Sequence, residues 1–201
     1  MKTAIVEACH RLAAEGLLIG TAGNVSVRDG SQVWVTASGA VLGALTEDDV
    51  VAADDPGATS EVALHLGVYD AYDAGAVVHT HAPVSTAAST VLDELPCIHY
   101  QQLLLGGSIR VAPYATFGTP ELASSVHAAL EGRSAALMAN HGSVALGSSL
   151  EKAVENALLL EWLCTVYRDA LAFGEPRTLT TQQQEDVILA AIARNYGGAT
   201  S

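Results

Sequence analysis

The sequence predicts an α/β protein, a single layered domain over residues 1–201 in which helices and strands interleave. Two observations predict this class. Short apolar runs recur between segments whose apolar residues repeat with helical spacing, and the dipeptide Asp29-Gly30 joins two alternating runs as a hairpin. No linker, repeat or low-complexity tract divides the chain. Half of the 201 residues are hydrophobic, which is enough apolar material for one sizeable core.

In the first half of the chain the expected elements rest on end signals and on periodicity. Gly16 is a good helix stop, and Asp29-Gly30 is a strong hairpin dipeptide. Thr46 begins a capped turn that leads into a short strand. In order, we expect a helix over residues 3–15, strands over 24–28 and 32–36, a strand at 50–51, a helix over 60–73 entered at Thr59-Ser60, and a strand at 77–78.

The second half carries similar signals. Pro120 suits the first position of a helix after Thr119, Glu131-Gly132 stops that helix, and Ser148-Ser-Leu-Glu151 reads as a capping box. In order, we expect a helical stretch over 82–91, a strand near Ile98, a strand at 109–111, a helix from Pro120, strands on both sides of His141, a long helix reaching Gly174, and a last helix over 182–196.

Composition excludes several function classes. The net charge is −13 and the chain has only nine Lys and Arg, which argues against a nucleic-acid or anionic membrane partner and favours a small molecule. No apolar run approaches the roughly 18 residues of a membrane span, and the N-terminus makes a poor signal peptide, so we expect a cytoplasmic protein. Cys9, Cys97 and Cys164 are odd in number and scattered, which predicts buried, reduced thiols.

Three histidines suggest a metal site. His79 and His81 end the apolar run 75–78, and side chains two residues apart in a strand share one face. His141 follows a second apolar run, 135–138. Three imidazoles leave one position open on a tetrahedral Zn²⁺, as in catalytic sites. A His-x-His pair alone is a weak signal, because many such pairs are simply solvated or hydrogen-bonded.

Three short loops offer neutral hydrogen-bond donors. The segments 20–24, 36–39 and 58–60 combine small residues, hydroxyls and a helix start, and such groups bind phosphate without lysine. Each loop alone also reads as an ordinary turn. Glu61 follows directly and is expected in the first helical turn, where its charged form is favoured; the plainer interpretation is a simple helix-start carboxylate.

Seven short motifs follow one another along the chain. They are Gly20-Thr-Ala-Gly-Asn-Val-Ser-Val-Arg28, Ser60-Glu61, Val77-Val-His-Thr-His81, Ile98-His-Tyr100, Ala112-Pro-Tyr-Ala-Thr-Phe-Gly118, Asn140-His-Gly142 and Leu150-Glu-Lys152. In this order they resemble the class II aldolase/adducin superfamily, over about residues 3–196, and most of all its L-fuculose-1-phosphate aldolases. The resemblance implies a three-layer fold with a central, mainly antiparallel sheet flanked by helices, and a homotetramer with sites at subunit borders.

The resemblance also implies roles for individual residues. Glu61 would ligate the resting metal and then serve as base, and Tyr100 would reach a neighbouring subunit's site to protonate the aldehyde oxygen. Tyr196 would support the reaction from the C-terminus, and Phe117 would line the aldehyde pocket. The implied metal ligands are His79, His81, His141 and Glu61, and the implied phosphate-binding residues are Gly23, Asn24, Ser38, Gly39, Thr59 and Ser60.

The implied reaction is reversible cleavage of a ketose 1-phosphate, L-fuculose 1-phosphate or a related deoxy-sugar phosphate, into dihydroxyacetone phosphate and an aldehyde. With only Lys2 and Lys152 available, a metal is a better electron sink than an imine. Zn²⁺ suits the ligands, with Mn²⁺, Co²⁺ or Fe²⁺ as alternatives. Ser38 and Thr59 exchange hydroxyl types relative to the L-fuculose-1-phosphate aldolases, and the segment 101–105 is bulkier, which leaves the aldehyde open.

Other functions of the same superfamily remain alternatives. A pentulose-5-phosphate 4-epimerase uses the same carbon–carbon cleavage step, and a sugar-phosphate dehydratase is a further possibility. A non-catalytic, adducin-like assembly module belongs to another class, and the metal ligands and the base that the resemblance assigns argue against it. Product analysis separates the enzymes, because an aldolase releases free dihydroxyacetone phosphate.

Overall fold

The computed structural model describes residues 1–194 and confirms the α/β class. Its centre is an eight-stranded sheet in the order β3-β2-β1-β4-β8-β7-β6-β5, in which only β6 and β7 pair in parallel. The sheet is therefore mainly antiparallel, as expected. The strands are β1 (Asn24–Asp29), β2 (Gln32–Thr36), β3 (Val50–Ala52), β4 (Ala76–Thr80), β5 (Glu94–Leu95), β6 (Ile109–Ala112), β7 (Ala135–Met138) and β8 (Gly142–Gly147).

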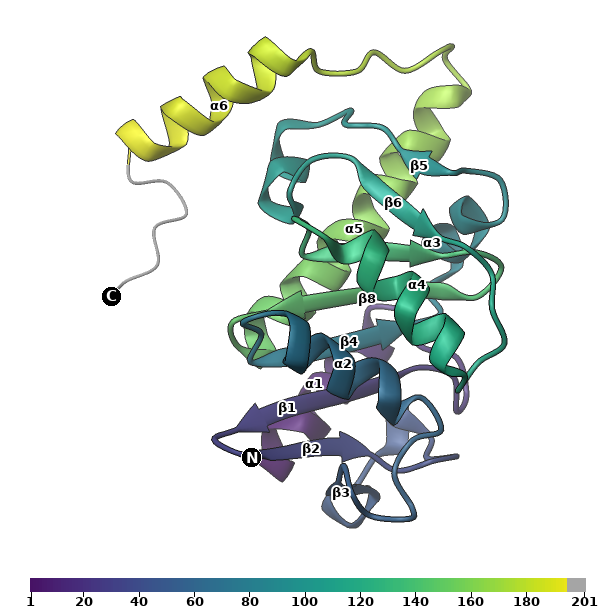
Figure 1. The fold of residues 1–201 in the computed structure, drawn as a ribbon. Coiled ribbons are helices and arrows are strands. Elements are labelled where there is room, and N and C mark those ends of the chain that lie inside the picture. The colour runs from purple at the N-terminus through teal and green to yellow at the C-terminus, as the bar shows by residue number, and fades with distance from the viewer. Residues whose placement is uncertain (195–201) are drawn as a thin grey trace.

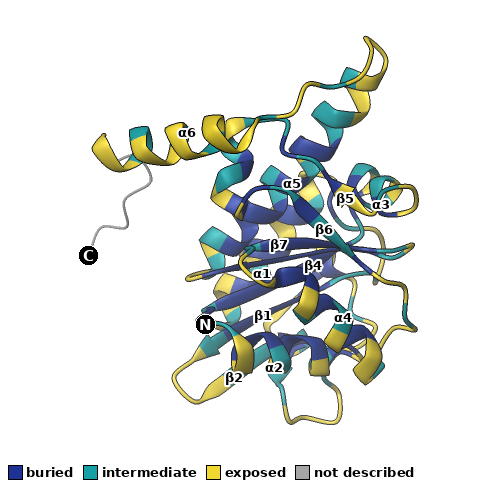
Figure 2. Cartoon of the chain, turned by 45° about the horizontal axis from the view of Figure 1, so that its top comes forward, coloured by how far each residue is buried: buried dark blue, intermediate teal, exposed yellow. Residues whose placement is uncertain are grey.

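Helices cover both faces of the sheet, which gives three layers (Figure 1). One apolar core lies between the sheet and α1 (Lys2–Ala14), α3 (Pro83–Ser89) and α5 (Leu150–Leu171). A second core lies between the opposite face and α2 (Val62–Ala71) and α4 (Pro120–Leu130). The central strands β4, β7 and β8 are wholly buried, whereas the outer strands are buried only in part (Figure 2).

The helix-end signals act largely as the sequence suggested. The Thr119 hydroxyl accepts a hydrogen bond from the amide of Leu122 and so caps α4. Thr46 and Asp49 form a reciprocal capping box around the short helix η2 (Glu47–Asp49). The cap of α5 is Ser149, whose hydroxyl accepts from the amide of Lys152, so the expected box at Ser148 is wrong by one residue.

Two expected elements differ in the structure. The strand near Ile98 is wrong: β5 stops at Leu95, and a 3-10 helix, η3 (Tyr100–Leu105), follows. Pro96 lacks an amide hydrogen, and the buried Gln102 side chain bonds the main chain of Leu95, Pro96 and Ile98 in place of a partner strand. The helix expected over 60–73 spans only α2, because a turn precedes it in which the amide of Val62 donates to the carbonyl of Thr59.

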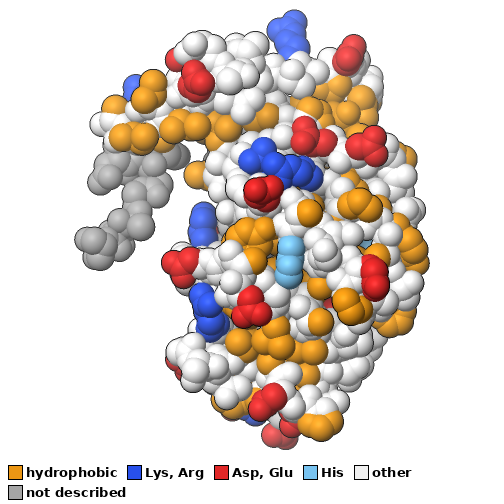
Figure 3. Space-filling model, viewed as in Figure 1, with side chains coloured by type: hydrophobic (Ala, Val, Ile, Leu, Met, Phe, Trp, Pro, Cys, Tyr) orange, Lys and Arg blue, Asp and Glu red, His pale blue; other side chains and the backbone are white. Residues whose placement is uncertain are grey.

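The last described helix, α6 (Thr181–Ala193), reaches away from the three layers (Figure 1). None of its residues is buried, and it contacts the body mainly at η3. Apolar side chains gather along it (Figure 3), among them the exposed Ile188, Leu189 and Ile192. Tyr196, expected in this helix, lies outside the described residues.

Two further expectations can be compared with the described chain. Cys9, Cys97 and Cys164 are free and buried, as predicted. In the part of the chain that is described, no helix has the length and apolar character that crossing a membrane requires.

Candidate functional site

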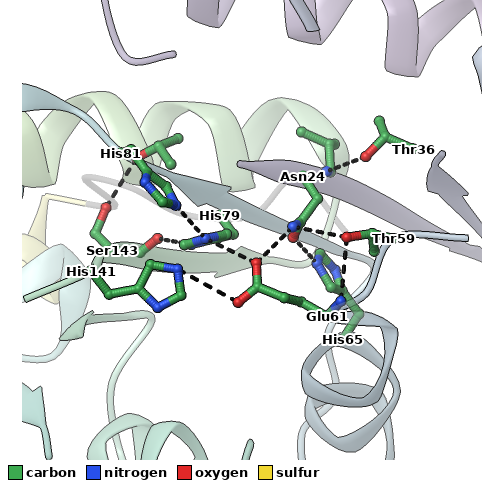
Figure 4. Close-up of polar contacts among 11 residues, drawn as sticks. Asn24, Thr36, Thr59, Glu61, His65, His79, His81, His141 and Ser143 are labelled. Carbon is green, nitrogen blue, oxygen red and sulfur yellow. Dashed lines mark hydrogen bonds and ion pairs between the residues drawn. The ribbon is translucent and has the colours of Figure 1, made fainter. Parts of the chain in front are cut away.

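Pairing of two strands brings the three histidines together. His79 lies in β4 and is fully buried, and His81 follows two residues later on the same face. β4 pairs with β8, so the turn that precedes β8 brings His141 beside them. The ligand nitrogens of the three rings all lie within 4.8 Å of one another, and the rings converge on one point (Figure 4).

The turn between β7 and β8 has a backbone suited to this position. Asn140 has a left-handed backbone with a φ of 55°, a conformation that asparagine tolerates better than most residues. At Gly142, a Cβ would lie 2.3 Å from the carbonyl oxygen of Thr80. The Asn-His-Gly sequence therefore lets β8 approach β4 closely enough to place His141.

Glu61 adds a carboxylate from the opposite side. It is the N-cap residue of α2, one position before the first helical turn in which we expected it. One oxygen, Oε2, lies 3.2 Å from Nε2 of His79, and the other, Oε1, lies 3.6 Å from Nε2 of His141. Burial alone would raise the pKa of this carboxyl group, but His79, the amide of Asn24 and His141 together hold its pKa below the usual range.

The donor atoms fit a divalent cation. Nδ1 of His79 donates to the carbonyl oxygen of Ser143 at 2.9 Å, which leaves Nε2 as the nitrogen whose lone pair can bind a metal ion. This lone pair faces Nε2 of His81 at 3.0 Å, and among residues 1–194 no hydrogen-bond donor reaches the buried Oε1 of Glu61. Converging acceptors repel one another unless a cation lies between them.

The protonation states of the rings favour ligation. Burial, with the charge of His79 as a further cause, lowers the pKa of His81 to about 4 and also lowers that of His141. Both rings are therefore neutral at neutral pH and available as ligands. Three imidazoles and one carboxylate suit Zn²⁺, Mn²⁺, Co²⁺ or Fe²⁺.

A cleft of about 310 Å³ opens beside these groups. At its edge, Gly23 has a φ of +95°, and a Cβ there would lie 2.7 Å from the carbonyl oxygen of His79, so only glycine fits. The three loops expected to bind an anion meet in this cleft. Its lining includes Gly23, Asn24, Ser38, Gly39, Thr59, Ser60, Glu61, His81, Phe117 and His141.

Comparison with known proteins decides the family. Residues 3–168 match the model of the family described as the class II aldolase and adducin N-terminal domain. The chain belongs to this family.

The similarity extends over nearly the full length of known aldolases. The chain is 38% identical to a 5-methylthioribulose-1-phosphate/5-deoxyribulose-1-phosphate aldolase of Rhodospirillum rubrum, over 94% of this chain and 89% of the relative. It is 39% identical to the L-fuculose phosphate aldolase of Escherichia coli K12, over 96% and 94%. A solved structure of an L-fuculose 1-phosphate aldolase superposes with a TM-score of 0.88, at 33% identity and 94% coverage of both chains. The protein is therefore an enzyme, a class II aldolase.

One residue expected to act in this aldolase, Tyr100, is not among the described residues that line the cleft. Tyr100 begins η3, is about half exposed, and lines a separate hollow with α6. Its ring packs against His99, with 4.6 Å between the ring centroids. Tyr196 lies outside the described residues.

The structure also adds residues that sequence reasoning missed. Tyr114 and Asn140 line the cleft of the aldolase. His65 is fully buried beneath it and bonds Asn24 and Ser26. Its position four residues after Glu61, on the same side of a helix, is the one sequence signal that could have indicated it.

Proposed function

We propose that this class II aldolase binds Zn²⁺ and reversibly cleaves a ketose 1-phosphate, L-fuculose 1-phosphate or a related deoxy-sugar phosphate, into dihydroxyacetone phosphate and an aldehyde. One observation carries the proposal: a histidine and carboxylate cluster that fits a divalent cation shares a single cleft with neutral donors suited to a phosphate. The phosphate group and the carbonyl on the carbon next to the phosphorylated one would then be held at the same time.

A divalent cation, when bound, supplies the Lewis acid that stabilises negative charge on the ketose carbonyl oxygen during carbon–carbon cleavage. Glu61 has the properties of the proton carrier. Its low pKa keeps it ionised, and its contacts with His79 and His141 place it beside the metal ligands. In the synthetic direction the ionised carboxylate would remove a proton from the dihydroxyacetone phosphate fragment. In cleavage the substrate hydroxyl loses a proton, the carboxylate takes up the equivalent proton from solvent, and the resulting carboxylic acid would deliver it to the carbanion of that fragment.

The phosphate would be held by the loops around Gly23-Asn24, Ser38-Gly39 and Thr59-Ser60. These loops are tied to one another: the amide of Ser38 donates to the carbonyl of Gly57, and the amide of Thr59 donates to the carbonyl of Thr36. Hydroxyl and amide donors are thus arranged before the substrate arrives, which reduces the free energy lost on binding.

The aldehyde end of the substrate is less defined by the cleft. Phe117 and Tyr114 line it and are each 66% exposed, so the described chain covers this end only partly. The relatives named above act on sugars that differ at this end. Their names support phosphorylated deoxy-ketoses as the class, with L-fuculose 1-phosphate and the 5-substituted ribulose 1-phosphates as the leading candidates.

The test is a coupled assay for dihydroxyacetone phosphate release from a panel of ketose 1-phosphates, with chelator and with added Zn²⁺. The proposal expects chelator-sensitive release, restored by Zn²⁺, and the fastest member of the panel identifies the aldehyde. Conversion without free dihydroxyacetone phosphate would instead identify an epimerase or a dehydratase.

We also propose a homotetramer in which Tyr100 protonates the aldehyde oxygen in a neighbouring subunit's site. Its exposure and its absence from the lining of its own cleft in the described chain support this role. Subunits carrying Glu61→Gln and Tyr100→Phe, each inactive alone, should regain about a quarter of wild-type activity when co-expressed in equal amounts, because one site in four then combines both intact groups. If Tyr100 acted in its own subunit, no mixed site would be restored.

A further inference from the structure

A chain of buried polar side chains extends from Glu61 into the protein, and the proposed reaction does not use it. Nδ2 of Asn24 lies 2.9 Å from Oε2 of Glu61, and Oδ1 of Asn24 lies 2.5 Å from Nε2 of His65. Nδ1 of His65 lies 2.6 Å from Oγ of Ser26, which lies 2.7 Å from the hydroxyl of Tyr69. All five side chains are buried, and His65 is fully so.

These contacts fix the direction of every hydrogen bond. Because the Glu61 carboxylate only accepts, the Asn24 amide must present its nitrogen to it, and its second hydrogen reaches the Thr59 hydroxyl at 3.1 Å. Oδ1 of Asn24 is then an acceptor, so His65 must carry its proton on Nε2. Nδ1 of His65 therefore accepts from Ser26.

The result is a relay whose donors all point toward the carboxylate: Tyr69 to Ser26, Ser26 to His65, His65 to Asn24, and Asn24 to Glu61. Figure 4 shows its inner part, with the His65 ring beneath Asn24. A flipped Asn24 amide would turn its oxygen toward the carboxylate and its NH₂ group toward the Nε2–H of His65. Both contacts would be repulsive, so the Nε2–H tautomer of His65 selects one orientation of Asn24.

We propose that His65 is a positioning residue for the general base: its Nε2–H group locks the Asn24 amide, and the amide holds the Glu61 carboxylate in the orientation that the reaction needs. This inference rests on the proposed function of Glu61. Burial, with the charge of His79 as a second cause, lowers the pKa of His65 to about 3, so the ring is neutral at neutral pH. The contact with Oδ1 of Asn24 then assigns its one proton to Nε2.

Two conservative variants separate positioning from packing. In His65→Gln the side-chain amide nitrogen occupies roughly the place of Nε2 and can still donate to Asn24. In His65→Asn the shorter amide occupies roughly the place of Nδ1 and reaches only Ser26. We expect His65→Asn to lower kcat about 10- to 100-fold with little change in KM, the range found for residues that orient metal ligands. His65→Gln should stay within about threefold of wild type.

The matched control is His10, whose Nε2 also bonds an oxygen, the carbonyl of Leu45 at 3.0 Å, but which lies outside the cleft. His10→Asn and His10→Gln should both leave kcat unchanged. Equal losses in the two His65 variants would show that the ring acts by packing and would overturn the proposal, as would full activity in His65→Asn.

Two further measurements keep the proposal falsifiable. In wild-type protein, ¹⁵N NMR of His65 should show the Nε2–H tautomer, and the Nδ1–H tautomer would refute the relay even if a variant failed to fold. Zn²⁺ affinity, measured by competition with a chelating dye, should be 10- to 100-fold weaker in His65→Asn than in His65→Gln. That comparison stands if wild type cleaves no sugar phosphate, so a failure of the proposed function is told apart from a failure of this inference.

Discussion

Replacing His65 by glutamine should change how the stability of the protein depends on pH. In the unfolded chain this histidine takes up a proton near pH 6.5, whereas in the folded protein burial lowers its pKa to about 3. Between these values the unfolded state binds more protons, so acid favours unfolding. The contribution of His65 to stability is therefore complete above pH 6.5 and is lost progressively as the pH falls toward 3.

The magnitude follows from these two pKa values. Lowering the pH from 7 to 5 should cost wild type about 2 kcal/mol of unfolding free energy through His65 alone, and lowering it to 6 should cost about 0.7 kcal/mol. Because pH 5 lies well above the folded-state pKa, the first figure depends almost entirely on the unfolded value. His65→Gln has no proton to gain and lacks this loss.

The assay is urea denaturation of both proteins at pH 7, 6 and 5 in the presence of chelator. The chelator removes the pH dependence of metal binding, and the other histidines are common to both proteins, so the difference between the two pH profiles isolates His65. Parallel profiles would refute the reasoning, because they would place the folded-state pKa of His65 near its unfolded value and imply contact with water.

Three more outcomes are expected. Glu61→Gln should lower kcat about 10²- to 10⁴-fold, the range of general acid–base catalysis, while thermal denaturation shows a folded protein; normal turnover would remove Glu61 from the reaction. Removing the metal with a chelator should abolish activity. It should also lower the free energy of unfolding by about 2.7 kcal/mol, compared with protein in Zn²⁺ at 100 times the Kd for the metal. Activity that is unchanged by chelator would contradict a metal-dependent enzyme. Gly142→Ala should destabilise the protein by about 1–3 kcal/mol in urea denaturation, because the new Cβ would lie 2.3 Å from the carbonyl oxygen of Thr80; an unchanged midpoint would show that β4 and β8 separate freely.

The sequence alone predicted structural features correctly where they depend on a few adjacent residues. The hairpin at Asp29-Gly30 and the cap at Thr119 depend on backbone preferences of a few adjacent residues, and both occur in the structure. His79 and His81 share a face because the strand period is two, which requires no knowledge of the tertiary fold. That His141 meets them depends on the pairing of β4 with β8, a contact across more than 60 residues. The apolar run before His141 suggested this contact, and the family resemblance implied it.

Predictions from the sequence were wrong or incomplete where tertiary contacts determine the local structure. Ile98 has the β-branched side chain of a strand residue, yet the buried amide of Gln102 bonds its main chain instead of a neighbouring strand. His65 was missed because its one sequence signal, a position four residues after Glu61, does not distinguish a hydrogen-bonded histidine from a packing residue. Its role depends on the direction of bonds to Asn24 and Ser26, which lie on a different element about 40 residues away.

The acidity of this protein bears on how it holds an anionic substrate. The chain has a net charge of −13, and among the residues that line the cleft in residues 1–194 there is no Lys or Arg. Long-range electrostatic attraction therefore contributes little to binding, and the proposed phosphate contacts depend on short, directional hydrogen-bond donors.

Such donors bind well only if they are already in place, because ordering a loop on binding costs free energy that offsets the free energy gained from its contacts. The backbone bonds from Ser38 to Gly57 and from Thr59 to Thr36 provide that order, and Thr59 is also tied to Asn24 and so to the carboxylate of Glu61. The loops proposed to bind phosphate and the proposed base thus form one hydrogen-bonded unit. In the proposed reaction, a substrate bound by its phosphate would therefore also be aligned with Glu61.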